Sequence, residues 1–270
     1  MMDCGNDYAA HYQWEWCRRE EWRGSFRERK RHSSGAFIEL VRERGLTACP
    51  VLDCSCGLGL KTIVMREAGL NVQGSDQCER AVEVARLLAA EEGHGDIQYF
   101  VSSWAELSRR TETRYAAIFN DALSWVYTDH EMATSLKGLH DCMLPGGVLA
   151  YMGALPGTRS SHKRILDQEW ERKTANGKHW LGARATDGAA SMQEVVFLEK
   201  GSDFIDEHHL YVVDRAGTIH VETWCLRCSL KWSWARIRRF LEEAGFSSFG
   251  VKQFVAENGK PFHLVIATRD

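Results

Sequence analysis

The chain has 270 residues, of which 44% are hydrophobic and 26% are charged, and this composition is typical of a globular protein. The 34 basic and 37 acidic side chains give a formal net charge of −3, so no overall charge attracts the chain to nucleic acid or to an anionic membrane. The length fits one large domain or two small ones. Ten tryptophans stand out, because Trp anchors cores or lines aromatic sites.

The cysteines and the N-terminal residues predict a reducing, cytoplasmic location. Nine cysteines are an odd number, Met1–Ala10 lack the apolar run of a signal peptide, and no segment approaches the roughly 18 apolar residues of a membrane-spanning helix. Cys54 and Cys56 form one close pair, and Cys225 and Cys228 form another. A structural zinc site needs matched pairs at finger-like spacing, so we expect free thiols and no bound metal.

Residues 1–45 predict N-terminal helices that act as a lid. The segment is dense in charge, it carries three tryptophans, and its run 23–31 is strongly basic. The apolar residues of 37–41 have the spacing of one helix face. Tyr8 and Tyr12 are candidates to close over a site, and Gly45 is a plausible helix end.

Strand and helix patterns alternate after Pro50. We expect strands at 51–56, 71–76, 97–101, 115–120 and 148–152, and helices at 60–68, 77–92 and 129–143. Strands that alternate with helices of this length predict a parallel, doubly wound sheet.

The alternation stops near residue 155. Residues 156–190 are polar and loop-like, and strand patterns at 191–199, 204–213 and 218–230 predict an antiparallel meander. A helix at 233–244 and a hairpin of strands 248–256 and 262–268 follow. We therefore expect N-terminal helices over 1–45, a core over 46–155 and 232–270, and a substrate-side β insert over 156–231.

The turn after the first strand carries the chemistry. Gly57 and Gly59 lie in it, Asp53 ends the first strand, and Asp76 ends the second. Ligands of open α/β sheets bind beyond the carboxyl ends of the strands, where a glycine turn lets the backbone approach them. An acid that ends the second strand can accept hydrogen bonds from ribose hydroxyls.

Two nucleotide-type cofactors fit such a turn. A dinucleotide enzyme has a third glycine where this chain has Thr62, and Asp53 would repel a pyrophosphate. S-adenosylmethionine has no phosphate and carries a cationic tail, which suits an acid at this position. The pattern of Asp53, Gly57, Gly59 and Asp76 resembles class I S-adenosylmethionine-dependent methyltransferases.

The order of elements along nearly the whole chain is similar to the glycine/sarcosine N-methyltransferase group. That resemblance implies a Rossmann-like α/β fold with a mostly parallel sheet, an antiparallel last strand, an N-terminal lid and the β insert. It implies that basic residues before the glycine turn hold the cofactor carboxylate and that a Trp after the third strand borders the adenine. The cofactor-binding residues expected from the motif and the resemblance are Arg29, Arg31, Asp53, Cys54, Ser55, Gly57, Gly59, Asp76, Gln77, Ser103, Trp104, Asn120, Asp121 and Ala122.

The substrate side departs from that group. An Arg that clamps the substrate carboxylate just after the fifth strand is missing from 151–154, and Arg159 is the nearest basic residue, so glycine is disfavoured as the substrate. No general base is identified, and an aromatic pocket that includes Trp125 would suit a cationic or aromatic acceptor. The substrate-side candidates are Tyr12, Trp125, Tyr127, His140, Tyr151 and Arg159.

We therefore expect a methyltransferase that acts on a small molecule, at an amine nitrogen, by in-line transfer with little or no general-base help. Transfer to oxygen or sulfur and an RNA methyltransferase remain open, as does a cofactor-binding protein without transfer chemistry. The expected partners are the small-molecule substrate and a possible second copy of the chain, with neither nucleic acid nor membrane.

Overall fold

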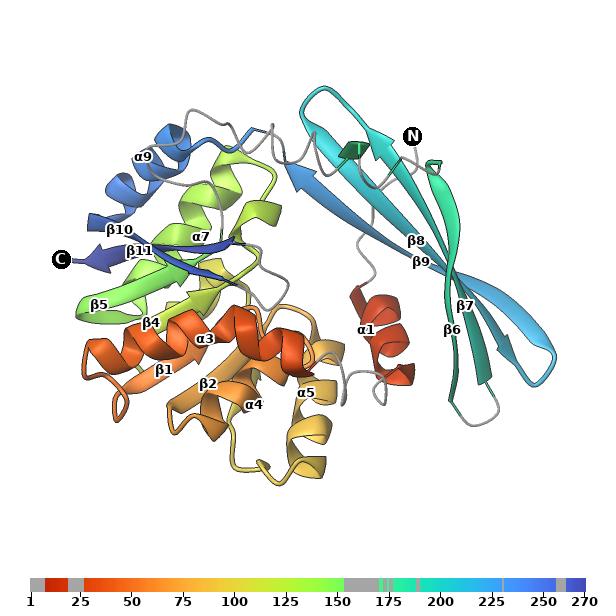
Figure 1. The fold of residues 1–270 in the computed structure, drawn as a ribbon, viewed down its shortest axis with the longest axis horizontal. Helices are drawn as coiled ribbons and strands as arrows, with labels where there is room; N and C mark the ends of the chain where they lie inside the picture. Colours follow the sequence, from red (N-terminus) through yellow and green to blue (C-terminus); the bar gives the residue numbers. More distant parts are fainter. Residues whose placement is uncertain are drawn as a thin grey trace.

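The computed structural model describes residues 8–18, 27–152, 170–171, 174, 177–187, 190–229, 231–255 and 261–270. Within these residues the chain forms a seven-stranded sheet and a separate four-stranded sheet (Figure 1). The strands of the larger sheet are β1 (Pro50–Asp53), β2 (Asn71–Asp76), β3 (Tyr99–Val101), β4 (Tyr115–Asn120), β5 (Met143–Tyr151), β10 (Phe246–Val255) and β11 (Pro261–Arg269).

The larger sheet is mostly parallel, with the order β10-β11-β5-β4-β1-β2-β3. Parallel pairs join β1 to β2 and β4, β2 to β3, and β4 to β5, whereas β11 lies antiparallel between β5 and β10. The expected Rossmann-like fold with an antiparallel last strand is thereby confirmed. The carboxyl ends of β1, β2 and β4 form one edge of this sheet, where the predicted motif lies.

Helices cover both faces of the larger sheet. On one face lie α3 (Arg27–Glu43), α4 (Leu60–Glu67) and α5 (Glu79–Glu91), and on the other lie α7 (Asp129–Asp141) and α9 (Trp234–Ala244) (Figure 1). The helices α5, α7 and α9 each bury one face, as the spacing in the sequence predicts. A capping box of Thr128 and Glu131 begins α7, and a left-handed Gly245 ends α9.

Several boundaries differ from the sequence prediction. The strand β5 begins at Met143 and not at residue 148, because the Pro145-Gly146-Gly147 segment belongs to it. The helix α7 accordingly ends at Asp141 and not at residue 143. The short helices η2 (Trp104–Glu106), α6 (Leu107–Arg110) and η3 (Leu123–Trp125) were not predicted, since three or four residues carry no detectable periodicity.

The insert is a four-stranded antiparallel sheet of β6 (His179–Asp187), β7 (Ala190–Lys200), β8 (Phe204–Arg215) and β9 (Thr218–Ser229). The prediction of a loop over 156–190 was wrong for β6. This edge strand mixes apolar and polar residues without regular alternation, and its Leu181 is 74% exposed, so the sequence does not mark it as a half-buried strand. The segment is a strand because its backbone pairs with that of β7 in an antiparallel ladder.

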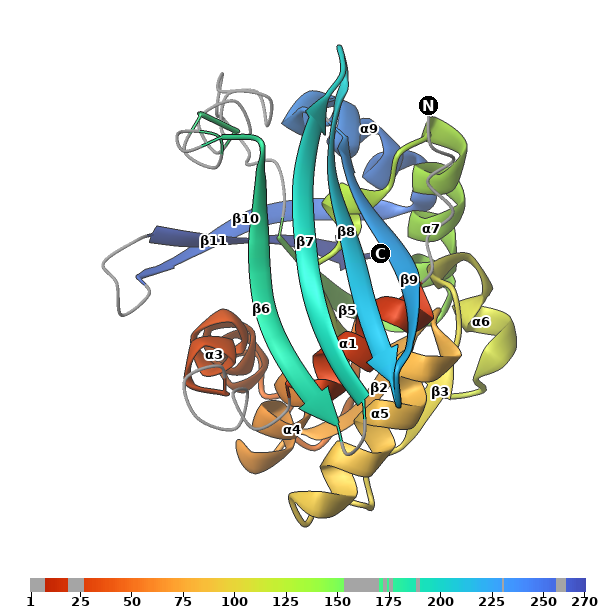
Figure 2. The same cartoon turned by 90° about the vertical axis from the view of Figure 1, so that its right-hand side faces the viewer.

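The helix α1 (Tyr8–Cys17) lies between the larger sheet and the insert (Figures 1 and 2). Ala10 and Trp14 are buried against the insert residues Tyr211 and Trp224. On the other side, Tyr12 and Trp16 pack against the cluster that contains the glycine turn and α5. None of the helices in the described ranges is long and apolar enough to cross a membrane.

Candidate active site

The glycine turn after β1 has a backbone that only glycine accommodates easily. Gly57 and Gly59 have positive φ angles of 52° and 76°. A Cβ atom on Gly59 would lie 2.7 Å from the hydroxyl oxygen of Tyr99. The turn therefore packs closely on the side chain of β3 and brings backbone amides to the carboxyl edge of the sheet.

Asp76 ties the glycine turn to β2. Its Oδ2 accepts a hydrogen bond of 3.0 Å from the backbone N–H of Gly57, and its Oδ1 accepts one of 3.0 Å from Cys78. Burial raises the pKa of this carboxyl group, while the backbone N–H groups of Cys78 and Gly57 act in the opposite direction. Gln77, the next residue, is exposed.

Tyr12 reaches this acid from α1. Its hydroxyl oxygen lies 3.3 Å from the position of a Cβ on Gly57 and interacts with the carboxylate of Asp76. Burial, and next the charge of Asp76, raise the pKa of the Tyr12 hydroxyl. Tyr12 was expected on the substrate side, and the structure places it beside Asp76 and Gly57.

Asp53 is a buried acid under the turn. Its Oδ2 accepts a hydrogen bond of 2.8 Å from the hydroxyl of Thr62. Its Oδ1 is buried and accepts no hydrogen bond of normal geometry from the described residues, although the backbone of Ser55 lies near the carboxylate. Burial raises the pKa of Asp53, and the charge of Lys61 opposes that shift. A buried acid with a spare acceptor suits a cationic group.

Replacing Asp53 with asparagine should stabilise the fold and weaken cofactor binding. A carboxyl group whose folded-state pKa lies above the ordinary 3.8 favours folding at low pH and loses that contribution as pH rises through the raised pKa. At pH 7 we expect the free energy of unfolding to rise by about 1 kcal/mol in the variant and cofactor affinity to fall by about 10-fold. Urea unfolding at pH 4 and pH 7, with calorimetric titration, measures both. A lower stability of the variant at pH 7 would contradict the argument.

The ends of β1 and β4 are joined by polar contacts. Asp121 accepts a 2.9 Å hydrogen bond from the Ser55 hydroxyl and forms an ion pair with Lys61. Asn120 donates to the Cys54 thiol at 3.3 Å, and its Oδ1 accepts from the backbone N–H of Ala122 at 2.9 Å. The sequence analysis missed Lys61, although a lysine on the buried side of a short helix is an unusual signal.

Trp104 lies beneath the same turn. Its indole N–H donates a 2.6 Å hydrogen bond to the backbone carbonyl of Cys54, which orients the half-buried ring. Ser103 precedes it, with its hydroxyl 3.5 Å from Glu106. Burial raises the pKa of the thiols of Cys54 and Cys56, which disfavours the thiolate form of both.

The other candidates are scattered. Trp125 is 41% exposed on η3, and the Tyr127 hydroxyl lies 3.4 Å from Asp203. Arg159 lies outside the described residues, as do the side chains of Arg29 and Arg31 in the first turns of α3.

The structure corrects one substrate-side candidate, His140, and buries another, Tyr151, in the core. His140 is at the end of α7, where its ring packs on Phe246, and α7 ends just before β5 begins. It therefore lies at the amino edge of the sheet, because crossover helices run opposite to the strands. Tyr151 ends β5 beside Asn120 of β4, and its side chain is fully buried in the cluster that also contains Cys54.

One group of described side chains in the insert has metal-ligand character. Donor atoms of Asp206, His208 and Cys225 lie within 4.8 Å of one another, and all three residues are buried. However, Arg227 donates two hydrogen bonds to Asp206, of 2.7 and 2.5 Å. The guanidinium already neutralises this carboxylate, so the group is better explained as a structural ion pair.

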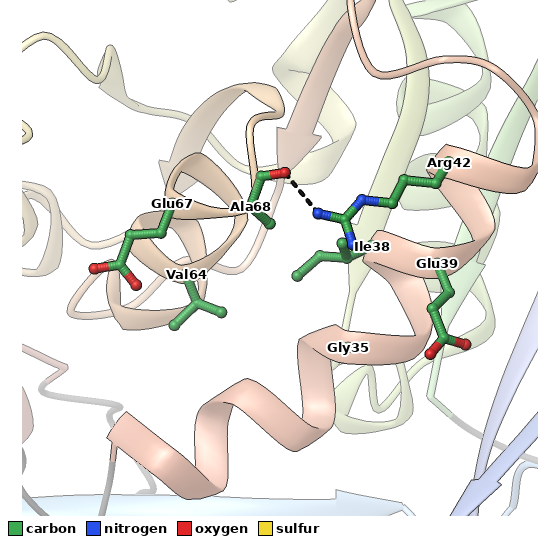
Figure 3. A pocket seen from close by; sticks show the side chains of 7 residues that line it. All are labelled: Gly35, Ile38, Glu39, Arg42, Val64, Glu67 and Ala68. Carbon is green, nitrogen blue, oxygen red and sulfur yellow. Dashed lines mark hydrogen bonds between the residues drawn. The ribbon is translucent and has the colours of Figure 1, made fainter.

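A surface pocket lies between α3 and α4 (Figure 3). Arg42 bridges the two helices by a 2.8 Å hydrogen bond to the carbonyl of Ala68. Ala68 follows the end of α4 that is remote from Gly59, so this pocket is separate from the glycine turn. It is lined by Gly35, Ile38, Glu39, Arg42, Val64, Glu67 and Ala68.

Comparisons with known proteins match this chain to methyltransferases. Residues 51–147 match a family model described as a methyltransferase domain. A ubiquinone biosynthesis O-methyltransferase from Leptothrix cholodnii is 28% identical over 102 residues, which are 38% of this chain and 43% of that protein. The match thus spans less than half the length of this curated relative.

Solved structures share the fold over most of the chain. DesVI from Streptomyces venezuelae has a TM-score of 0.63 at 15% identity, with 98% of this chain and 99% of that chain covered. The sugar N-methyltransferase KedS8 from a Streptoalloteichus species has a TM-score of 0.64 at 15% identity, with 93% and 90% covered.

Residues 51–147 match the methyltransferase domain, and they contain Asp53, the glycine turn and Asp76. The cofactor that this match and the fold neighbours support is S-adenosylmethionine. The described residues fit that cofactor, because the turn has the backbone shape of a cradle and Asp53 offers a buried acceptor to a cation.

Proposed function

We propose that the chain transfers the methyl group of S-adenosylmethionine to an amine nitrogen of a small molecule. When bound, the cofactor supplies a methyl group that its sulfonium already activates for displacement. Asp76 would hold the ribose, Trp104 would border the adenine, and the turn around Gly57 would receive the amino-acid tail. The protein's main tasks are to align the acceptor and to exclude water.

A cluster on the inner face of the insert supports an amine acceptor. The His209 ring lies 2.8 Å from Glu194 and 3.2 Å from Glu207, so one imidazole stands between two carboxylates. Burial disfavours the charged imidazolium, but the two carboxylates outweigh it and raise the pKa of His209. With His209 charged, these three groups carry a net charge of −1, which suits a cation.

Aromatic rings surround this cluster. Trp224 lies opposite His209 on β9, with ring centroids 4.8 Å apart, and Tyr211 is two residues along β8. His11 of α1 stacks on Trp224 at 4.0 Å and lies 3.2 Å from the Tyr211 hydroxyl. Rings together with a negative charge are the usual environment for an ammonium group.

Helix α1 connects this cluster to the cofactor side. His11 faces the insert, whereas the next residue, Tyr12, faces Asp76 and the glycine turn. The two rings are 5.1 Å apart. Helix α1 therefore lies between this cluster and the glycine turn and contacts both.

The fold neighbours include a sugar N-methyltransferase, which agrees with nitrogen as the acceptor atom. We also propose that the helices and strands of this chain follow the same order as those of the glycine/sarcosine N-methyltransferase group. Glycine itself is disfavoured, because 151–154 lack the carboxylate-binding Arg of that group. The net charge of −3 disfavours RNA.

The experiment is a methyl-transfer screen in which each amine is paired with the alcohol and the thiol of the same skeleton, with S-adenosylhomocysteine formation as the readout. We expect turnover with amines. Turnover restricted to alcohols or thiols would contradict the nitrogen assignment. Turnover on RNA that falls steeply with salt would favour an RNA methyltransferase.

The variant Glu207→Gln tests the cluster within the same screen. We expect KM for the best amine to rise by about 10-fold with kcat changed less than 3-fold, because a charged partner of the acceptor is lost. Glu199→Gln on β7 is the matched control, since Glu199 is an exposed carboxylate on the opposite face of the insert. Equal KM values for both variants would speak against the cluster.

A further inference from the structure

Lys61 is a buried lysine beside the glycine turn. It is in the first turn of α4, two residues after Gly59, and it is only 6% exposed. Its Nζ lies 5.5 Å from the centre of the Phe119 ring, so the stem is packed on β4. A buried ammonium is costly unless it is paired, and lysine is seldom buried in this way.

The partners of Lys61 are two acids, the partly exposed Asp121 and the buried Asp53. It forms an ion pair with Asp121, whose side chain is 22% exposed and also accepts the Ser55 hydroxyl. The charge of Lys61 also acts on Asp53, whose Oδ1 is buried without a normal hydrogen bond from the described residues. Lys61, Asp121 and Asp53 together carry a net charge of −1.

This charge matches the cationic end of S-adenosylmethionine. Its sulfonium and ammonium are positive and its carboxylate is negative, so the tail has a net charge of +1. If the carboxylate pairs with Lys61 and the ammonium with the two acids, every buried charge keeps a partner. An exchange of one paired arrangement for another avoids the desolvation penalty of an isolated ion.

We propose that Lys61 holds the carboxylate of the cofactor's amino-acid tail, while Asp121 and Asp53 hold its ammonium group. The tail would thereby replace the ion pair between Lys61 and Asp121. This proposal rests on the proposed function, and it assigns to Lys61 the role that the family resemblance gives to Arg29 and Arg31.

The test compares two ligands by calorimetric titration: S-adenosylmethionine and its decarboxylated form, which differ only in the carboxylate. In the unaltered protein we expect the decarboxylated form to bind at least about 10-fold more weakly, because Lys61 then faces two further cations. Equal affinities in the unaltered protein would overturn the proposal without any variant.

Lys61→Met should abolish the difference between the two ligands, and Lys61→Arg should restore at least part of it. Lys137→Met is the matched control, since Lys137 also pairs with an aspartate, Asp141, but on the surface of α7. A difference that persists in Lys61→Met would show that another residue holds the carboxylate. If Lys61→Met does not fold, Lys61→Gln takes its place.

The outcome separates this proposal from the proposed function. Absence of binding of S-adenosylmethionine and S-adenosylhomocysteine to the unaltered protein would refute the methyltransferase function itself. Binding that does not distinguish the two ligands would leave that function intact and refute the assignment of Lys61.

Discussion

Replacing Asp76 with alanine should lower the affinity for S-adenosylhomocysteine by about 100-fold or more. The carboxylate accepts hydrogen bonds from the backbone of Gly57 and Cys78 and is expected to accept those of the ribose. Each hydrogen bond to a charged group contributes about 1.5–3 kcal/mol, so losing the ribose contacts alone accounts for a large effect. Calorimetric titration of the purified variant measures it.

The pattern across ligands makes the Asp76 result specific. Methylthioadenosine keeps the ribose and lacks the amino-acid tail, so Asp76→Ala should weaken both ligands, whereas Lys61→Met should leave methylthioadenosine unchanged. Asp96→Ala is the control, because Asp96 is an exposed acid in an ion pair with Arg66. A folded Asp76→Ala protein with unaltered affinity would remove the ribose assignment.

The arrangement of the candidate cofactor site was largely predictable, because its signals are local. A glycine with positive φ and an acid at a strand end each leave a mark within a few residues. Asp53, Gly57, Gly59 and Asp76 all lie at the carboxyl edge of the sheet, as the alternation of strands and helices predicts. The parallel order of the strands brings these separate segments together.

The contacts that depend on distant segments were not predictable. Tyr12 lies against Gly57, and Lys61 pairs with Asp121, across separations of 45 and 60 residues. His209 stands between Glu194 and Glu207 only because β7 and β8 pair in one register, and a slip of one residue would turn His209 to the other face. Local patterns in the sequence do not encode that register.

The positions of the substrate-side candidates have a similar origin. Tyr151 follows the alternation of β5, but the depth at which its side chain is buried depends on tertiary packing. His140 was placed by its nearness in sequence to β5, yet the end of a crossover helix lies at the amino edge of the sheet. Neither position could be read from spacing alone.

Replacing Trp232 with alanine should lower the free energy of unfolding by about 3–5 kcal/mol. The ring is 1% exposed, its N–H donates a 2.5 Å hydrogen bond to the carbonyl of Val126, and it packs edge-on against Phe240. The variant would create a cavity and leave a buried carbonyl without its donor. Urea unfolding, followed by tryptophan fluorescence and far-UV circular dichroism, measures the change.

Trp232 also connects parts of the chain that meet at the site. It follows the last strand of the insert and contacts Val126, which lies next to the exposed Trp125 on η3 and to Tyr127. Trp125→Ala is the control and should change the free energy of unfolding by less than about 1 kcal/mol, because its side chain is 41% exposed. Below the unfolding transition, Trp232→Ala should still bind S-adenosylhomocysteine, since Asp76 and the glycine turn are not among its contacts. Equal destabilisation by the two substitutions would mean that Trp232 does not anchor the return of the insert to the core.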